Sequence, residues 1–393
     1  MWQAVAMRIA VVAGPDPGHA FPAIALCRKL RAAGAEPTLY TGVEWLETAR
    51  AAGIAAAELL GLDPTDEDDD ADAGEKIHRR AARMAVLGAE PIAALAPDLV
   101  VSDVITACGG MAAELLGIPW VELNPHPLYL PSKGLPPLGS GLAPGTGLRG
   151  RLRDAVMRKL TERSWRAGLA QRAAARQSIG LPADDPGPVR RLIATLPALE
   201  VPRPDWPAEA VVVGPLHFEP TAEVLTPPPG DGPLIVVAPS TATTGALGMA
   251  ELALQTLIPG KTLPAGARVA VSRLGGADLE VPPWAVVGLG RQDELLAGAD
   301  LMICGGGHGI VAKTLLAGVP MVIVPGGGDQ WEMANRVVRQ GSGRLIRPLG
   351  AEALVDAVEE VLAAPHHAEA ARAAGASIAQ VADPVRVCQD AIR

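Results

Sequence analysis

The chain has 393 residues, which favours two or three domains, and its 49% apolar and 20% charged residues exclude wholesale disorder. A formal net charge of −9 argues against a general nucleic-acid binder. The four cysteines are scattered without a CxxC pair, which excludes a zinc ribbon and a disulfide framework and fits a reducing compartment. Because the sequence contains neither a membrane-spanning apolar run nor a secretory leader pattern, we expect a cytoplasmic protein.

Strands and helices are predicted to alternate in the amino-terminal half. Residues 8–13 form a β-branched run that ends in a Gly/Pro cluster, and residues 21–33 follow with apolar side chains at helical spacing. Further strands are expected at 38–41, 98–102, 120–123 and 211–213, and further helices at 44–52 and 110–116. This order is typical of a parallel α/β sheet.

The same pattern restarts after a proline-rich linker. Strands are expected at 234–238, 268–271, 285–287, 301–304 and 321–324, and the last helices at 352–364 and 368–378. We therefore predict two doubly wound α/β domains: 1–215, a linker at 216–232, a second domain at 233–375 and a tail at 376–393. The segment 131–147, rich in Pro and Gly, is predicted to be a long loop.

The residues that follow the predicted strands are the first candidates for a site, because open parallel sheets bind ligands at the carboxyl ends of their strands. His19 lies at the first such junction and is suited to act as a general base on a hydroxyl group. Asp103 follows a later strand and is suited to orient that histidine. Both residues have structural alternatives, since His19 and Asp103 are also suited to cap helix starts.

A glycine-rich segment at 304–335 is the most informative part of the sequence. Gly305–Gly307 end a predicted strand, and a helix is expected to begin near Gly309, an arrangement that suits a diphosphate. The alternative is that the glycines only allow tight packing of a strand against a helix. Asp329 and Gln330 follow the next strand and offer hydrogen-bonding groups suited to sugar hydroxyls.

The segment GGGHGIVAKTLLAGVPMVIVPGGGDQWEMAN resembles the donor-binding signature of the family 1 glycosyltransferases, which have the GT-B fold. The opening PGHAFPAIALCRKLRAAGAEPTLYT and the run VVVGPL resemble two further motifs of that family, of the bacterial natural-product type that uses UDP- or TDP-sugars. The resemblance implies that His19 is the catalytic base and Asp103 its partner. It also implies a donor site at Ser240, Thr241, Gln292, Gly305, Gly306, Gly307, His308, Gly309, Lys313, Asp329 and Gln330.

Three positions depart from the family pattern. Gly305 stands where the family has a phosphate-binding histidine, Ile310 where it has Ser or Thr, and Lys313 where it has a ribose-binding glutamate. We expect Lys313 near the positive end of a helix dipole, where a cation is unfavourable unless an anion offsets it. One interpretation is that His308 and Lys313 both face a donor diphosphate. The alternatives are that donor binding is lost, or that Lys313 is simply solvated.

These observations predict an inverting glycosyltransferase that moves a sugar from a nucleoside diphosphate to a hydroxyl of a small, apolar acceptor. No metal site and no cofactor beyond the nucleotide-sugar co-substrate are expected, because no cluster of His, Asp and Glu has metal-ligand spacing. Two alternatives stay open: a catalytically degenerate homologue that binds a ligand or assists a partner enzyme, and a nucleotide-sugar epimerase.

Two charged runs bear on partners. The acidic run at 63–72 is predicted to be a solvated loop. The basic segment at 148–176 has apolar residues at roughly helical spacing, which suits either peripheral contact with the inner face of the membrane or an exposed helix packed on the amino-terminal sheet. The oligomeric state, the sugar, the nucleotide and the acceptor do not follow from the sequence.

Overall fold

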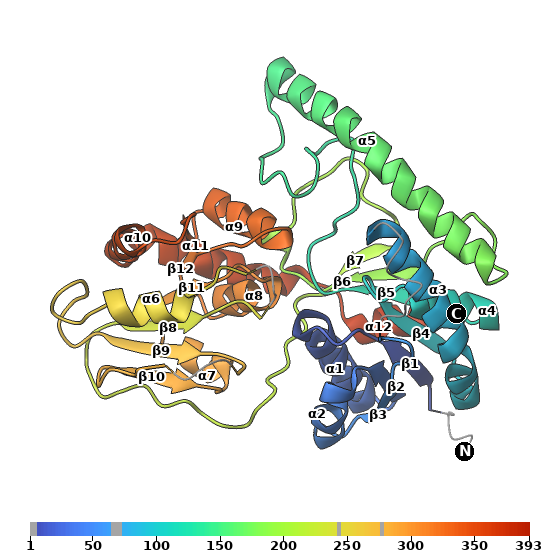
Figure 1. Ribbon diagram of the computed structural model, residues 1–393, viewed down its shortest axis with the longest axis horizontal. Helices are drawn as coiled ribbons and strands as arrows, with labels where there is room; N and C mark the ends of the chain where they lie inside the picture. The colour runs from blue at the N-terminus through green and yellow to red at the C-terminus, as the bar shows by residue number, and fades with distance from the viewer. Residues whose placement is uncertain (1–5, 64–72, 242–244, 276–278) are drawn as a thin grey trace.

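The computed structural model describes residues 6–63, 73–241, 245–275 and 279–393, which form two separate parallel sheets with helices on both faces (Figure 1). The predicted fold class is confirmed. Most of the acidic run at 63–72 lies outside the described residues. None of the helices in the described ranges combines the length and apolarity that a membrane-crossing segment needs.

The first sheet has the strand order β3-β2-β1-β4-β5-β6-β7. Its strands are β1 (Arg8–Val12), β2 (Glu36–Thr41), β3 (Ala55–Glu58), β4 (Leu99–Asp103), β5 (Trp120–Asn124), β6 (Arg190–Ile193) and β7 (Ala210–Val212). Its helices are α1 (Pro17–Ala32), α2 (Leu46–Ala51), α3 (Ala73–Leu95), α4 (Cys108–Leu116) and α5 (Gly147–Ser178).

Burial of both faces explains why these strands read as continuous apolar runs. Successive side chains of β1 point to opposite faces, so Ile9 and Val11 pack with Leu26 of α1 on one face of the sheet. Val12 packs with Met111 of α4 on the other face. The first sheet is therefore a central layer between two layers of helices.

The second sheet has the strand order β10-β9-β8-β11-β12-β13. Its strands are β8 (Leu234–Ala238), β9 (Arg268–Ser272), β10 (Ala285–Gly288), β11 (Leu301–Cys304), β12 (Met321–Ile323) and β13 (Gly343–Leu345). Its helices are α6 (Met249–Thr256), α7 (Gln292–Ala297), α8 (His308–Leu316), α9 (Asp329–Gln340), α10 (Ala351–Ala363) and α11 (Pro365–Ala376).

The end of the chain returns to the first sheet. Helix α12 (Pro384–Asp390) contacts α1 and β6, and its Val385 and Cys388 are buried in the same apolar cluster as Ile9 (Figure 1). The backbone N–H of Ala382 also donates a hydrogen bond to the carbonyl oxygen of Val212 in β7, 2.9 Å away. The two sheets are thus linked by the segment 213–233 and again by the residues before α12.

Several elements differ from the prediction. Strands β3, β6 and β13 and helices α3, α6, α7, α9 and α12 are absent from the predicted set. The three strands, AAAE, RRLI and GRL, lack the apolar β-branched run that marks the predicted ones, and α3 contains Pro91 in its interior. Helix α1 begins four residues earlier than predicted, because Pro17 occupies a first-turn position that a helix tolerates.

Candidate active site

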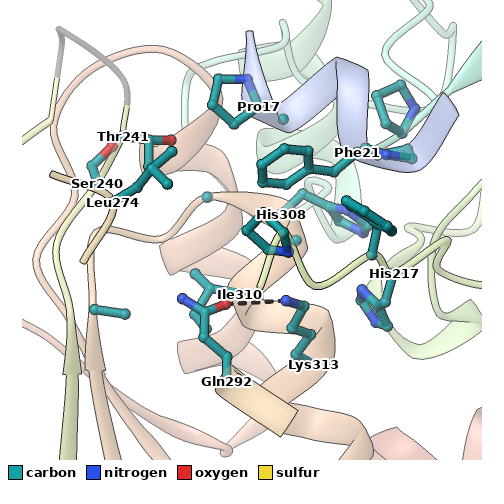
Figure 2. Close-up of a pocket in the computed structure, with 18 of the residues that line it drawn as sticks. Pro17, Phe21, His217, Ser240, Thr241, Leu274, Gln292, His308, Ile310 and Lys313 are labelled. Atoms are coloured by element: carbon teal, nitrogen blue, oxygen red, sulfur yellow. Dashed lines mark hydrogen bonds between the residues drawn. The ribbon is translucent and has the colours of Figure 1, made fainter. Parts of the chain in front are cut away.

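A cavity of about 520 Å³ lies between the carboxyl ends of the two sheets (Figure 2). Most of the predicted site residues line it: His19, Ser240, Thr241, Gln292, Gly305, Gly307, His308, Gly309, Lys313, Asp329 and Gln330. Of the remaining two, Asp103 is buried behind His19, and Gly306 lies within the glycine loop. The structure therefore brings candidates from both halves of the chain to one place, as the strand-end rule predicts.

His19 and Asp103 form a pair on the amino-terminal side of the cavity. His19 is the third residue of α1, and its Nδ1 lies 2.7 Å from Oδ1 of Asp103 at the end of β4. The Asp103 side chain is fully buried, and its Oδ2 accepts hydrogen bonds from the Ile105 N–H and the Thr106 hydroxyl. The helix-capping alternative for Asp103 is wrong, because α4 begins only at Cys108 with Ala107 as its N-cap residue.

Asp103 determines the pKa of His19 and which of its ring nitrogens carries the proton. Burial lowers the pKa of His19, but the hydrogen bond and the negative charge of Asp103 outweigh it, so the pKa lies above the ordinary 6.5. Because a carboxylate only accepts hydrogen bonds, Nδ1 carries the proton, and Nε2 of the neutral ring is left as a base. The geometry is that of an oriented general base.

A second histidine beside His19 is absent from the predicted site. His126 lies two residues after β5, lines the cavity, and meets the His19 ring edge-on with 6.4 Å between centroids. The His126 ring also stacks on the ring of Tyr129, and its Nδ1 lies 2.7 Å from the carbonyl oxygen of Pro127. Burial lowers the pKa of His126, which favours a neutral ring. Its position after a strand is the signal that the strand-end rule could have used.

The glycine loop is shaped by close packing on one side and is open on the other. A Cβ atom at Gly305 would lie 2.8 Å from Cβ of Ser240, so this position has no room for the histidine that the family pattern carries. Gly306 has a φ of +81°, which favours glycine. A Cβ atom at Gly307 or Gly309 would meet no other atom within 4 Å. The packing and ligand-approach interpretations of the glycines therefore apply to different residues.

Asp329 and Gln330 have different environments although they are adjacent at the start of α9. Asp329 is exposed at the cavity, whereas Gln330 is buried. The Gln330 side chain accepts a hydrogen bond from the Gly326 N–H at 3.0 Å and donates one to the Ser240 hydroxyl at 2.8 Å. Gln330 thus ties two loops of the cavity together, and Asp329 is the member of the pair that faces the open space.

Lys313 has a protein partner that the sequence did not suggest. Its Nζ lies 2.6 Å from Oε1 of Glu219, in the segment that connects the sheets, and donates to Oε1 of Gln292 at 3.1 Å (Figure 2). The side chains of Lys313 and Glu219 are only 12% and 15% exposed. The predicted place near the positive end of the helix is wrong, because α8 begins at His308 and Lys313 lies in its last turn. The solvated-lysine alternative is also wrong.

His308 connects α8 to the opposite domain. Its Nε2 lies 2.8 Å from the Thr195 hydroxyl, which follows β6 of the first sheet, and the ring is buried. Burial, with the charge of Arg336 nearby, holds the pKa of His308 well below its ordinary value, so the ring is neutral. His308 therefore reaches the cavity as a neutral group bound to the amino-terminal domain, and not as a cation available to a diphosphate.

The sequence is similar to known glycosyltransferases. Residues 290–385 match the family model "Glycosyltransferase family 28 C-terminal domain". The chain is 30% identical over 366 residues to 4'-demethylrebeccamycin synthase of Lentzea aerocolonigenes, and the match covers 86% of each chain.

Two solved structures share the fold. The glycotransferase of kitacinnamycin superposes with a TM-score of 0.75 at 21% identity, covering 98% of this chain and 97% of that one. The Streptomyces sp. SF2575 glycosyltransferase SsfS6, complexed with thymidine diphosphate, superposes with a TM-score of 0.65 at 22% identity, covering 98% of each chain. With the paired sheets, the cleft between them and the long match to a relative, the chain belongs to the GT-B glycosyltransferases of the bacterial natural-product type.

Proposed function

We propose that this glycosyltransferase moves a sugar from a nucleoside diphosphate to a hydroxyl group of a small, apolar acceptor, with inversion and without a metal ion. The observation that carries the proposal is the His19–Asp103 pair, held at 2.7 Å and facing the cavity that also contains the glycine loop. A positioned base on one side and an open glycine loop on the other suit the two halves of a displacement reaction.

In the proposed step, Nε2 of His19 takes the proton of the acceptor hydroxyl. The acceptor oxygen forms a bond to the anomeric carbon as the bond from that carbon to the diphosphate breaks on the opposite side, which inverts its configuration. The buried Asp103 stabilises the imidazolium that forms, since its carboxylate is already fixed by Ile105 and Thr106.

The leaving diphosphate would be held at the start of α8. The first N–H groups of a helix have no partner within the helix, and Gly307 and Gly309 leave space for a ligand to approach them. These N–H groups and the helix dipole supply a positive field for the developing charge, which supports the metal-independent form of the proposal. Asp329, exposed at the same cavity, is placed to accept hydrogen bonds from sugar hydroxyls.

The test uses thymidine and uridine diphosphates and their sugars, chosen because a structural relative was solved with thymidine diphosphate. We expect a nucleoside diphosphate at about 100 times its Kd to stabilise the chain by about 2.7 kcal/mol, and the phosphate-free nucleoside to do far less. We expect His19→Ala to lower kcat for transfer by about 10²–10⁴-fold while the stabilisation by diphosphate stays unchanged.

The outcomes separate the alternatives. A His19→Ala variant that keeps transfer within a few-fold of the wild type would remove His19 from the mechanism. Absence of any diphosphate effect on melting would favour a degenerate binding homologue. Conversion of a nucleotide-sugar without an acceptor would favour an epimerase.

A further inference from the structure

The amino-terminal half of helix α5 projects from the rest of the molecule. The whole helix spans Gly147–Ser178, about 48 Å at 1.5 Å per residue, and only Asp154, Ala175 and Arg176 among its 32 residues are buried. Figure 1 shows it as a long arm whose carboxyl-terminal part lies near α3, while its amino-terminal half projects away from both sheets. Helices in water are usually stabilised by a face packed against something. The loop before α5 covers only the inner side of its projecting half, where the Gly145 N–H donates to Asp154 at 2.7 Å and Arg158 donates to the carbonyl oxygen of Leu135 at 2.8 Å, and the outward side is exposed.

The outward face of this half is apolar. Leu148, Leu152, Val156 and Leu160 recur every four residues, which places them in one sector of the helix about 120° wide at 100° per residue. Their exposed fractions are 87%, 65%, 51% and 76%. A continuous apolar row of this kind marks an interaction surface more often than single exposed leucines do.

The same face is positively charged. Arg149, Lys159, Arg163 and Arg166 lie in the same sector, and Glu162 pairs with Lys159 and Arg166 from its border. Within the described ranges, no acidic side chain pairs with Arg149 or Arg163.

The charge of the helix contrasts with that of the protein. Helix α5 carries nine Arg and Lys residues against Asp154 and Glu162, although the whole chain has a net charge of −9. Asp154 does not reach the outward face, since its side chain is 4% exposed and accepts a hydrogen bond from the Gly145 N–H at 2.7 Å. Five of the nine cations pair with acidic side chains: Arg153, Lys159, Arg166, Arg172 and Arg176. The charge of the outward face beside the apolar row is therefore chiefly that of Arg149 and Arg163.

Charge complementarity decides which partner fits this face. A second copy bound through the same face would bring two strongly basic helices together, which is unfavourable. An anionic bilayer offers an apolar layer for the four aliphatic side chains and phosphate groups for the neighbouring cations, whose long stems can reach the headgroups. We propose that the outward face of α5, defined by Leu148, Leu152, Val156, Leu160, Arg149 and Arg163, docks on an anionic lipid surface.

Flotation of the full chain with vesicles tests this proposal. We expect binding to phosphatidylglycerol vesicles, much weaker binding to phosphatidylcholine vesicles, and loss of binding as salt is raised. Each arginine removed should lower the partition coefficient about fivefold, from about 1 kcal/mol per charge near the surface, so Arg149→Gln/Arg163→Gln should lower it about 25-fold. Leu152→Ser/Leu160→Ser should lower it at least about tenfold.

Matched controls come from exposed residues elsewhere. Leu247→Ser changes a leucine that is 90% exposed, and Arg386→Gln changes an exposed arginine on α12, and neither should alter the partition. Light scattering measures whether the free chain self-associates, and circular dichroism checks that each variant keeps its helices. Equal binding to both lipids, variants that bind as the wild type does, or a dimer that the leucine substitutions dissociate would each overturn the proposal.

Discussion

The ion pair between Lys313 and Glu219 explains how a lysine can be buried beside the cavity, and its contribution to the stability of the fold can be measured. Replacing Glu219 by Gln keeps the shape of the side chain and removes its charge, leaving Lys313 with the Gln292 amide oxygen at 3.1 Å. At 2.6 Å the attraction between two unit charges is about 6 kcal/mol for an effective dielectric constant near 20, most of which offsets desolvation.

Removing one partner of a buried pair costs about 3–5 kcal/mol, because the other charge is left unpaired. Both side chains here keep some contact with solvent, so we expect Glu219→Gln to lower the free energy of unfolding by about 2–3 kcal/mol. At about 2–4 °C for each kcal/mol, the melting temperature should fall by about 4–12 °C.

Thermal unfolding of a double-mutant cycle measures the pair itself. Lys313→Met, Glu219→Gln and the double variant should show a coupling energy of about 1–3 kcal/mol. The reversed pair, Glu219→Lys/Lys313→Glu, should be more stable than Lys313→Glu alone. The control is Asp293→Asn, which breaks an exposed pair with Arg291 and should cost less than about 1 kcal/mol. A coupling energy near zero would refute the view that Glu219 is what compensates Lys313.

Three further predictions concern the His19–Asp103 pair and the metal-independent reaction. Because the pKa of His19 is raised and its neutral form is the base, kcat/KM should rise with pH through a value above 6.5, and Asp103→Asn should move that rise to lower pH while lowering the rate. The pair of charged His19 and Asp103 also stabilises the fold at a pH below the pKa that His19 has in the unfolded chain. This stabilisation is lost as the pH rises through the higher pKa of His19 in the folded chain. We therefore expect His19→Gln to lower the free energy of unfolding more at pH 5.5 than at pH 9. Transfer should survive EDTA, and loss of turnover restored by added magnesium would contradict the metal-independent mechanism.

Local sequence patterns were sufficient for the framework of the fold. The β-branched strands are buried on both faces, so they appear as apolar runs, and the glycines and prolines that end them mark the carboxyl edge where ligands bind. For that reason His19, Asp103, the glycine loop and Asp329 could be selected before any contact was known. The edge strands β3 and β13, AAAE and GRL, lack such an apolar run, and only pairing with a neighbouring strand defines them.

Contacts between distant segments were decided only by the tertiary structure. Glu219 and Lys313 are 94 residues apart, and no local pattern of charge indicates that they meet. His308 likewise begins α8, but its hydrogen-bond partner Thr195 follows β6 in the other sheet and is brought near only across the cleft. Because strand ends are local features, His19, Asp103 and Asp329 could be identified from the sequence, although His126, which also follows a strand, was missed. The protonation state and the partner of each candidate depend on burial and on the charges that another domain brings near, and these exist only once the two sheets face each other.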